Sequence, residues 1–109
     1  EVIRFEALAG HVLLTTPGTR TVLESIAQAR LAPLAAHDAA HGTELLGSLR
    51  AFLEHNGQWE AASVSLGVHR HTLRNRMDRA QSLLGVDLDS AHVRAELLLA
   101  LSAWQELDR

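Results

Sequence analysis

One stretch of the chain, residues 58–84, limits the folds that are open to the rest of it. Gly67 divides this stretch into a short apolar segment and a longer one. In the longer segment, apolar residues recur at the period of one face of an α-helix. These residues are Leu73, Met77, Ala80 and Leu84. A short helix, a glycine turn and a second helix together predict a helix-turn-helix motif.

The residues at the junction agree with two separate helices. Gly67 stands where the first helix must stop, and glycine readily adopts the positive φ that ends many helices. His69 is in place to cap the second helix. Val68 and Leu73 have the spacing of a hydrophobic staple across that helix start. We therefore expect the second helix to cover about residues 69–84.

Basic and hydrogen-bonding side chains occupy the second helix away from its apolar stripe. Residues 68–80 hold four arginines and one acid, Asp78, a formal charge of +3 in a chain of net charge −3. Helix N-termini favour phosphate, arginine pairs with guanine, and asparagine pairs with adenine. This combination predicts a recognition helix for double-stranded DNA. The alternative reading is a solvated, arginine-rich helix face.

We predict DNA contacts at seven residues of this helix. The base readers are expected to be Arg70, His71, Arg74 and Asn75. The phosphate contacts are expected to be Thr72, Arg76 and Arg79, aided by the backbone N–H groups of Gln58 and Trp59. Arg76 lies close enough to the apolar stripe to pair with an acid instead. Asp78 marks the expected end of close DNA approach.

Composition excludes several other classes of protein. The 109 residues contain no Cys, which excludes disulfides and thiolate metal sites. No apolar run is long enough for a membrane span, and the first residues lack the layout of a signal peptide. We expect a cytoplasmic protein. Because the chain does not begin with Met, we expect it to be a fragment of a longer protein.

The periodicity of the remaining chain predicts a mainly α fold, with a three-helix helix-turn-helix core and additional N-terminal and C-terminal helices. The expected helices cover about residues 20–30, 34–41, 43–55, 58–66, 69–84 and 91–107. Residues 1–16 contain short β-prone pieces, so at most one small β element is expected, before residue 17.

Several residues suggest where these helices begin. Thr19 or Thr21 is expected to cap the first helix, Thr43 the third and Ser90 the last. Pro33 is expected in the first turn of the second helix, where its missing N–H is tolerated.

The apolar residues of these helices form the expected core. The apolar stripe of the first helix consists of Val22, Ile26 and Ala29. Residues expected to be largely buried are Leu49, Phe52, Leu53, Trp59, Ala62, Leu66, Leu73, Met77 and Leu84. Trp59 should pack against Phe52 or the recognition helix, whereas Ser63 and Ser65 should lie on the surface.

Alternative functions find less support in the sequence. His37 and His41 have the i, i+4 spacing of a metal site, but no third ligand is evident and surface histidines are the commoner case. Neither a nucleophile motif nor a phosphate-binding loop is present, and His69 and His71 should point in different directions on a helix. We therefore expect neither an enzyme nor a cofactor. A helical interaction module without DNA contact stays open, because Leu98 and Leu99 lie outside the apolar stripe of the last helix.

The chain resembles the C-terminal helix-turn-helix of PucR/CdaR-type bacterial transcriptional regulators over about residues 38–103. The resemblance rests on Thr43-Glu44-Leu45-Leu46, Leu49-Arg50-Ala51-Phe52-Leu53, Leu66-Gly67-Val68-His69-Arg70, Thr72-Leu73-Arg74, Arg76, Leu84-Gly85 and Asp87-Leu88-Asp89. His37-Asp38 and His41-Gly42-Thr43 also resemble the lead-in of that family. Three places depart from its common pattern: His71 replaces Asn, Asn75 replaces Tyr, and Ser90-Ala91 replaces Asp-Pro.

The resemblance implies a transcriptional regulator whose upstream domains, absent here, sense a small-molecule effector. It implies that residues 1–30 are the tail of an upstream GGDEF-like domain or a linker, and that residues 31–109 form the DNA-binding domain. Helix-turn-helix modules usually bind paired half-sites as dimers, so we expect the full-length protein to be a homodimer. Because His71 and Asn75 depart from the pattern on the predicted DNA face, the family's operator sequence does not carry over.

Overall fold

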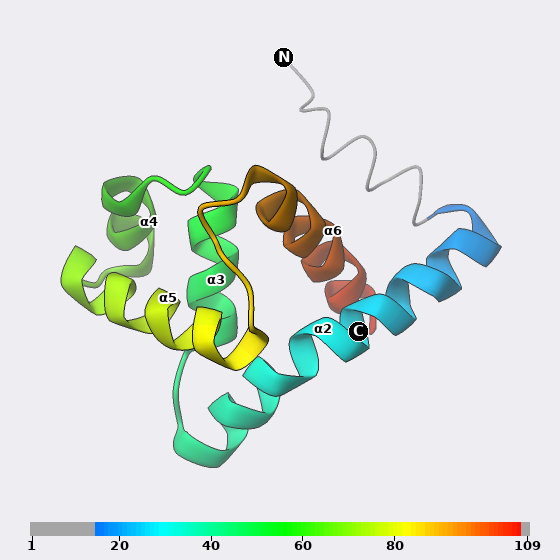
Figure 1. The fold of residues 1–109 in the computed structure, drawn as a ribbon, viewed down its shortest axis with the longest axis horizontal. Coiled ribbons are helices and arrows are strands. Elements are labelled where there is room, and N and C mark those ends of the chain that lie inside the picture. Colours follow the sequence, from blue (N-terminus) through cyan, green and yellow to red (C-terminus); the bar gives the residue numbers. More distant parts are fainter. Residues whose placement is uncertain (1–14, 108–109) are drawn as a thin grey trace.

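The structure is a computed structural model that describes residues 15–107, with side chains described for residues 15–104 (Figure 1). Within that range it consists of helices and contains no strand. The helices are α2 (Pro17–His41), α3 (Leu45–Glu54), α4 (Trp59–Leu66), α5 (Arg70–Leu84) and α6 (Ala91–Leu107). The mainly α fold is thereby confirmed. The β-prone residues 1–14 lie outside the described range.

Two groups of helices form the molecule. The long α2 packs mainly against α6, and α3, α4 and α5 form the compact three-helix unit beside them (Figure 1). Contacts of α2 with α3 and α5, and of α3 with α6, join the two groups. Among the described helices, none combines the length and the hydropathy that a membrane-spanning segment requires.

The prediction of two helices around Pro33 is wrong, because α2 continues through this proline. Proline in a helix interior removes one backbone hydrogen bond and costs about 3 kcal/mol. Leu31 and Leu34, on either side of Pro33, are both fully buried, whereas Pro33 itself is exposed. Burial of the two leucines offsets the unfavourable proline. The continuous helix also runs across residues 30 and 31, where we placed a domain boundary.

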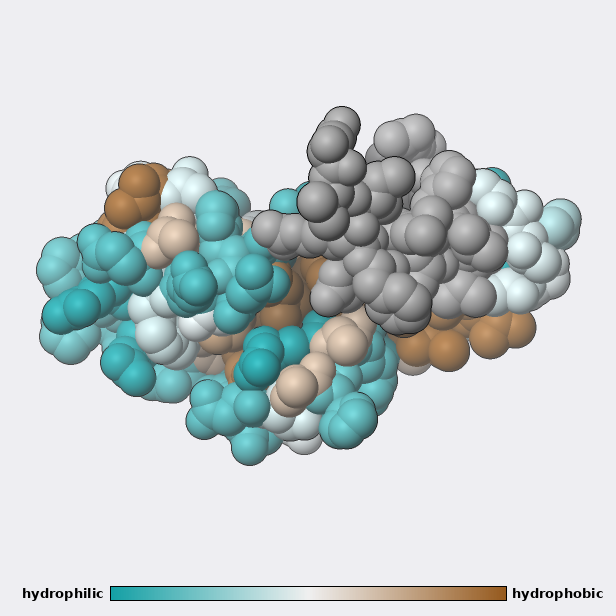
Figure 2. Space-filling view, turned by 90° about the horizontal axis from the view of Figure 1, so that it is seen from above, coloured by the Kyte–Doolittle hydropathy of each residue, from teal (hydrophilic) through white to brown (hydrophobic). Residues whose placement is uncertain are grey.

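The predicted apolar stripe of the first helix is also wrong. Val22 is 57% exposed and Ile26 is 42% exposed. The buried stripe lies further round the helix and consists of Ala27, Leu31 and Leu34. Both stripes have helical spacing, so the packing of α6 decides which is buried. Figure 2 shows hydrophobic surface left exposed toward the end of the molecule formed by α2.

An ion pair closes the contact between α2 and α6. The Arg30 guanidinium donates to the Glu96 carboxylate, and both side chains are partly exposed. This pair lies at the edge of the surface by which α2 contacts α6.

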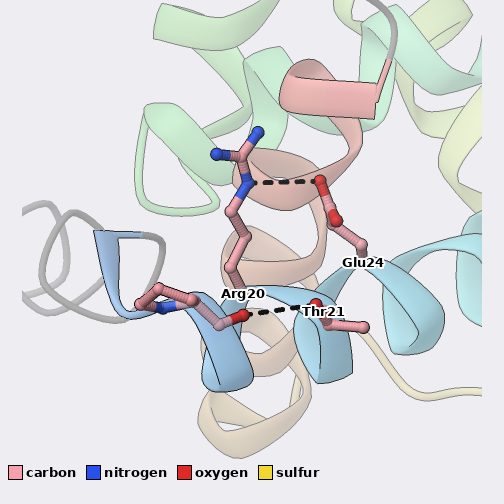
Figure 3. Close-up of polar contacts among 4 residues, drawn as sticks. Arg20, Thr21 and Glu24 are labelled. Carbon is pink, nitrogen blue, oxygen red and sulfur yellow. Dashed lines mark hydrogen bonds and ion pairs between the residues drawn. The ribbon is translucent and has the colours of Figure 1, made fainter.

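The first turns of α2 are stabilised by contacts within the helix and have no side-chain cap. Thr16 precedes the helix and makes no side-chain capping bond, and Pro17 occupies the first turn. The Thr21 hydroxyl donates to the Pro17 carbonyl at 3.2 Å, and Arg20 Nε lies 3.4 Å from Glu24 Oε2 (Figure 3). Capping by Thr19 or Thr21 was therefore a wrong prediction, because the helix begins earlier than expected.

Asp38 makes the corner between α2 and α3. Its carboxylate accepts the backbone N–H groups of Leu45 at 2.8 Å and Leu46 at 3.0 Å, together with the Thr43 hydroxyl. The prediction of Thr43 as N-cap is wrong: the N-cap position is Glu44, and Asp38 accepts the first N–H groups of the helix instead. Burial alone would raise the pKa of the Asp38 carboxyl. The hydrogen bonds from Thr43, Leu46 and Leu45, with His37 nearby, outweigh that effect and lower this pKa below 3.8.

The loop before α6 is held by hydrogen bonds with side chains of both α5 and α6. The Leu88 side chain is buried, and its backbone N–H donates to the Gln81 side chain at 2.8 Å. Arg94 Nη1 donates to the Leu88 carbonyl at 2.8 Å. Ser90 Oγ accepts the Val93 N–H at 3.3 Å, which confirms the predicted cap of α6.

The core is one cluster that runs through both helix groups. Six of the nine predicted core residues are buried: Leu49, Phe52, Leu53, Ala62, Leu73 and Met77. Trp59, Leu66 and Leu84 are half-buried and pack against the cluster. The cluster also contains Leu31, Leu34, Leu97 and Leu101, so α2 and α6 share one core with the helix-turn-helix.

Candidate nucleic-acid interface

The turn between α4 and α5 contains the predicted left-handed glycine and the predicted histidine cap. Gly67 has φ 70°, the left-handed conformation that favours glycine. His69 is the N-cap of α5, and its Nδ1 accepts the His71 backbone N–H at 3.0 Å. Ser63 is buried and its hydroxyl donates to the Glu60 carbonyl, so its predicted surface position is wrong. These contacts fix the direction in which α5 leaves the turn.

The two faces of α5 differ in character. One face buries Leu73, Met77 and Ala80, and Gly85 in a left-handed conformation ends the helix. The other face is exposed to solvent. The exposed predicted contact residues are Arg70, His71, Thr72, Arg74, Asn75 and Arg79. Figure 2 shows that the end of the molecule formed by α4 and α5 is mostly hydrophilic on the side that it presents.

A shallow hollow opens at the start of α5. It is lined by His69, Arg70, His71 and Arg74. The N-terminus of α5 lies at the same place, and the His69 side chain pairs one of its first N–H groups, that of His71. Two exposed guanidinium groups and the positive end of a helix dipole therefore meet here, which favours a negatively charged partner.

Arg74 is supported by an aromatic ring. Its Cζ lies 4.9 Å from the centroid of the Trp59 ring, in a cation–π arrangement. The Trp59 ring packs in turn against Phe52 of α3, with 4.7 Å between centroids and 45° between planes. Packing of Trp59 against Phe52 or the recognition helix was expected. The structure shows the Phe52 contact, together with a contact to the Arg74 guanidinium that was not predicted. The two residues are fifteen positions apart, and their contact depends on the turn geometry.

Among the predicted DNA contacts, Arg76 makes a side-chain hydrogen bond to another helix. Its Nη1 donates to Ser48 Oγ at 2.9 Å, and the Ser48 hydroxyl donates to the Glu44 carbonyl at 2.6 Å. Ser48 is fully buried. Arg76 therefore links α5 to α3 through a serine rather than through an acid. Ser48 was not among the predicted residues, although a serine among the buried leucines of this helix was a signal.

The backbone at the start of α4 differs from the prediction. The Gln58 N–H donates to the His55 carbonyl at 3.0 Å and is not available to a phosphate. Within α4 the first backbone bond goes from Ala62 to Gln58. The N–H groups of the first turn, beginning with Trp59, thus have no acceptor within the helix.

Two pairs of histidines lie close together among the described residues. The His69 and His71 rings lie 5.8 Å apart, contrary to the prediction that they point in different directions, because His69 is the cap and not part of the helix. His37 and His41 stack at 4.4 Å. Their Nδ1 atoms contact Thr43 Oγ1 and the His37 carbonyl. No group of three potential ligands is found in the described range.

Comparison with known proteins agrees with this geometry. The profile of the PucR C-terminal helix-turn-helix domain matches residues 45–103, the segment from α3 into α6. No solved structure matches the chain.

Curated relatives are longer than this chain. An uncharacterized protein in the pkwA 5' region of Thermomonospora curvata is 38% identical over 96 residues, which cover 88% of this chain and 51% of that protein. The transcriptional activator PmfR of Paenarthrobacter nicotinovorans is 36% identical over 62 residues, 57% of this chain and 13% of PmfR. The proline-responsive transcriptional activator PutR of Bacillus subtilis is 34% identical over 71 residues, 65% of this chain and 17% of PutR.

The chain therefore spans about half the length of the first of these relatives and a smaller part of the other two. The match to the domain profile covers more than half of the chain and coincides with the observed helix-turn-helix. The chain belongs to the PucR C-terminal helix-turn-helix family, the DNA-binding domain of a group of transcriptional regulators.

Proposed function

We propose that this domain binds double-stranded DNA in a sequence-specific manner by placing the start of α5 in the major groove. One observation carries the proposal. The first two turns of α5 expose Arg70, His71, Arg74 and Asn75, while the opposite face of the helix is locked into the core by Leu73. A rigid helix that presents base-pairing side chains at its N-terminal end is the arrangement by which this motif reads DNA.

The base readers follow from side-chain chemistry. Arg70 and Arg74 can each present a two-pronged guanidinium to guanine, and Asn75 can pair with adenine. His71 is exposed on the same two turns of the helix. We assign base edges to these four residues.

Phosphate contacts are assigned to the residues on the flanks of the same face. Thr72 and Arg79 are exposed, as a phosphate contact requires. Arg76 uses one N–H for Ser48, and its guanidinium has further donors, so a phosphate contact by Arg76 stays a prediction. Trp59 contributes its backbone N–H at the start of α4.

The intact protein is proposed to act as a cytoplasmic homodimer regulated by an effector that upstream domains bind. The names of PmfR and PutR describe transcriptional activators. Residues 1–30 are proposed to be the tail of an upstream domain or a linker, which continues into this domain through α2 and adds Ala27 to its core. Two helix-turn-helix units would then read paired half-sites, because one unit buries little DNA surface. Sedimentation of the full-length protein tests this, and a monomer at micromolar concentration would contradict it.

Selection of bound sequences from random duplex DNA tests the assignment of readers. The Arg70→Ala and Arg74→Ala variants should each lose about 1–3 kcal/mol of binding free energy and relax the preference at one base pair. Arg79→Ala should weaken all sequences alike and reduce the salt slope by about one.

Arg20→Ala is the matched control. It removes one arginine from the distant α2 and changes the net charge by the same amount. Its effect on binding should be small at ordinary ionic strength, because screening weakens charges beyond about 10 Å. If Arg70→Ala and Arg74→Ala leave affinity and preference intact, α5 is not the reader. Absence of salt-dependent binding would instead favour a helical interaction module.

A further inference from the structure

The Arg74 guanidinium lies over the first of two aromatic rings that contact each other. Trp59, the first residue of α4, lies between the Arg74 guanidinium and the buried Phe52 ring of α3. Phe52 lies near Gly57, where an added Cβ would already be in van der Waals contact with its ring. The pair of rings therefore connects the core of the domain to a side chain on the proposed DNA face.

Arg70 lacks a comparable support. It lies at the start of α5, exposed, and within the described residues it makes no cation–π contact and no side-chain hydrogen bond. The two proposed guanine readers thus differ before DNA arrives. Arg70 must be ordered on binding, whereas the guanidinium of Arg74 is already oriented.

A ring beneath a guanidinium has two physical effects. The ring's electron cloud attracts the cation, most strongly for tryptophan. A guanidinium stacked on a ring also has a fixed plane, and the plane decides which base edge its two N–H groups can meet. A side chain held in its bound conformation loses less conformational freedom on binding, which raises affinity.

We infer that Trp59 is a positioning residue for Arg74: it holds the guanidinium in the orientation that reads one base pair. Trp59 would then set sequence preference without itself touching a base. This inference rests on the proposed function, because it takes Arg74 to be a reader. The inference goes beyond the proposed function because it assigns sequence specificity to a residue of α4.

The test compares Trp59→Leu and Trp59→Phe in the full chain, using the duplex selected by the unaltered protein and duplexes changed at each base pair. Trp59→Leu should weaken binding about two- to fivefold, the size of a cation–π contact. The loss of preference should fall on the base pair that Arg74→Ala also relaxes. Trp59→Phe keeps a ring with weaker attraction, so its loss should be smaller and at the same pair.

A double-mutant cycle separates positioning from packing. In the Arg74→Ala background, Trp59→Leu should cause no further loss of discrimination at that base pair. Trp104→Leu is the control, since it removes the other tryptophan, a half-buried residue of α6 that packs against the core. It should lower thermal stability and leave base preference unchanged.

Failure of the inference differs from failure of the proposed function. If Arg74→Ala relaxes one base pair but Trp59→Leu weakens all duplexes alike in both backgrounds, Trp59 acts on stability alone and the inference is overturned. If Trp59→Leu does not fold, an equal effect of Trp59→Phe on all duplexes overturns it as well. If Arg70→Ala and Arg74→Ala both leave preference intact, the reader assignment itself has failed.

Discussion

Helices α5 and α2 differ in what determines them. The ends of α5 follow from local chemistry: His69 caps its start, and Gly85 in a left-handed conformation ends it. In α2 the N-cap makes no side-chain bond, and a proline lies in the interior. The C-terminus of α2 ends at a left-handed Gly42, as α5 ends at Gly85. The comparison teaches that local signals define both ends of the recognition helix, whereas burial against the rest of the domain carries α2 through its interior proline.

The largest expected effect tests whether α2 belongs to the same folding unit as α5. Leu73 of α5 and Leu31 of α2 are both fully buried in one cluster. Leu73→Ala and Leu31→Ala should each lower the free energy of unfolding by about 2–5 kcal/mol, because each leaves a cavity. Chemical denaturation measured by circular dichroism checks both values.

Ile26→Ala is the matched control on α2, since Ile26 is 42% exposed. It should lower stability by less than about 1 kcal/mol, in the range of partly exposed positions. A neutral Leu31→Ala beside a destabilising Leu73→Ala would show that α2 is an appendage. A large effect of Ile26→Ala would show instead that another part of the protein covers this face.

The same comparison explains what the sequence could predict. The helix-turn-helix was predictable because Gly67, His69 and the stripe from Leu73 act within a few residues of one another. In α2, the stripes containing Ile26 and Leu31 both have helical spacing, so periodicity could not choose between them. The choice depends on α6, which lies some sixty residues further along the chain.

The same distinction between local signals and contacts between helices applies to the candidate site. The exposure of Arg70, Arg74 and Arg79 was predictable, because each lies off the apolar stripe of its helix. The support of Arg74 by Trp59 and the bond from Arg76 to Ser48 were not, since both join different helices. Contacts between helices depend on crossing geometry, which residue spacing along one helix does not encode.

A second prediction concerns the continuity of α2 through Pro33. Pro33→Ala supplies the missing backbone N–H on an exposed face of the helix. It should raise the free energy of unfolding, by at most about 3 kcal/mol, because the proline penalty is removed. Part of this gain should be lost to the greater freedom of the unfolded chain.

Thermal unfolding of Pro33→Ala beside Pro17→Ala makes the test specific. Pro17 lies in the first turn of α2, where proline is tolerated, so Pro17→Ala should have little effect. If Pro33→Ala lowers stability, the helix does not continue through residue 33, and the two-helix prediction from the sequence would be restored.

The smallest effect is expected at the corner where α2 meets α3. Asp38→Ala should lower the free energy of unfolding by about 0.5–2 kcal/mol, the range for loss of a helix cap.

The contribution of Asp38 to stability should also depend on pH. Because folding lowers the pKa of this carboxyl, the stabilisation is present above pH 3.8 and is lost as the pH falls through the folded pKa. Asp38→Asn keeps one acceptor and carries no charge. The stability difference between the unaltered chain and Asp38→Asn should therefore be constant near neutral pH and shrink below about pH 4. A difference that stays the same between pH 7 and 3 would show that the Asp38 carboxylate does not hold the corner, and that the N-terminus of α3 is ordered by burial, as α2 is.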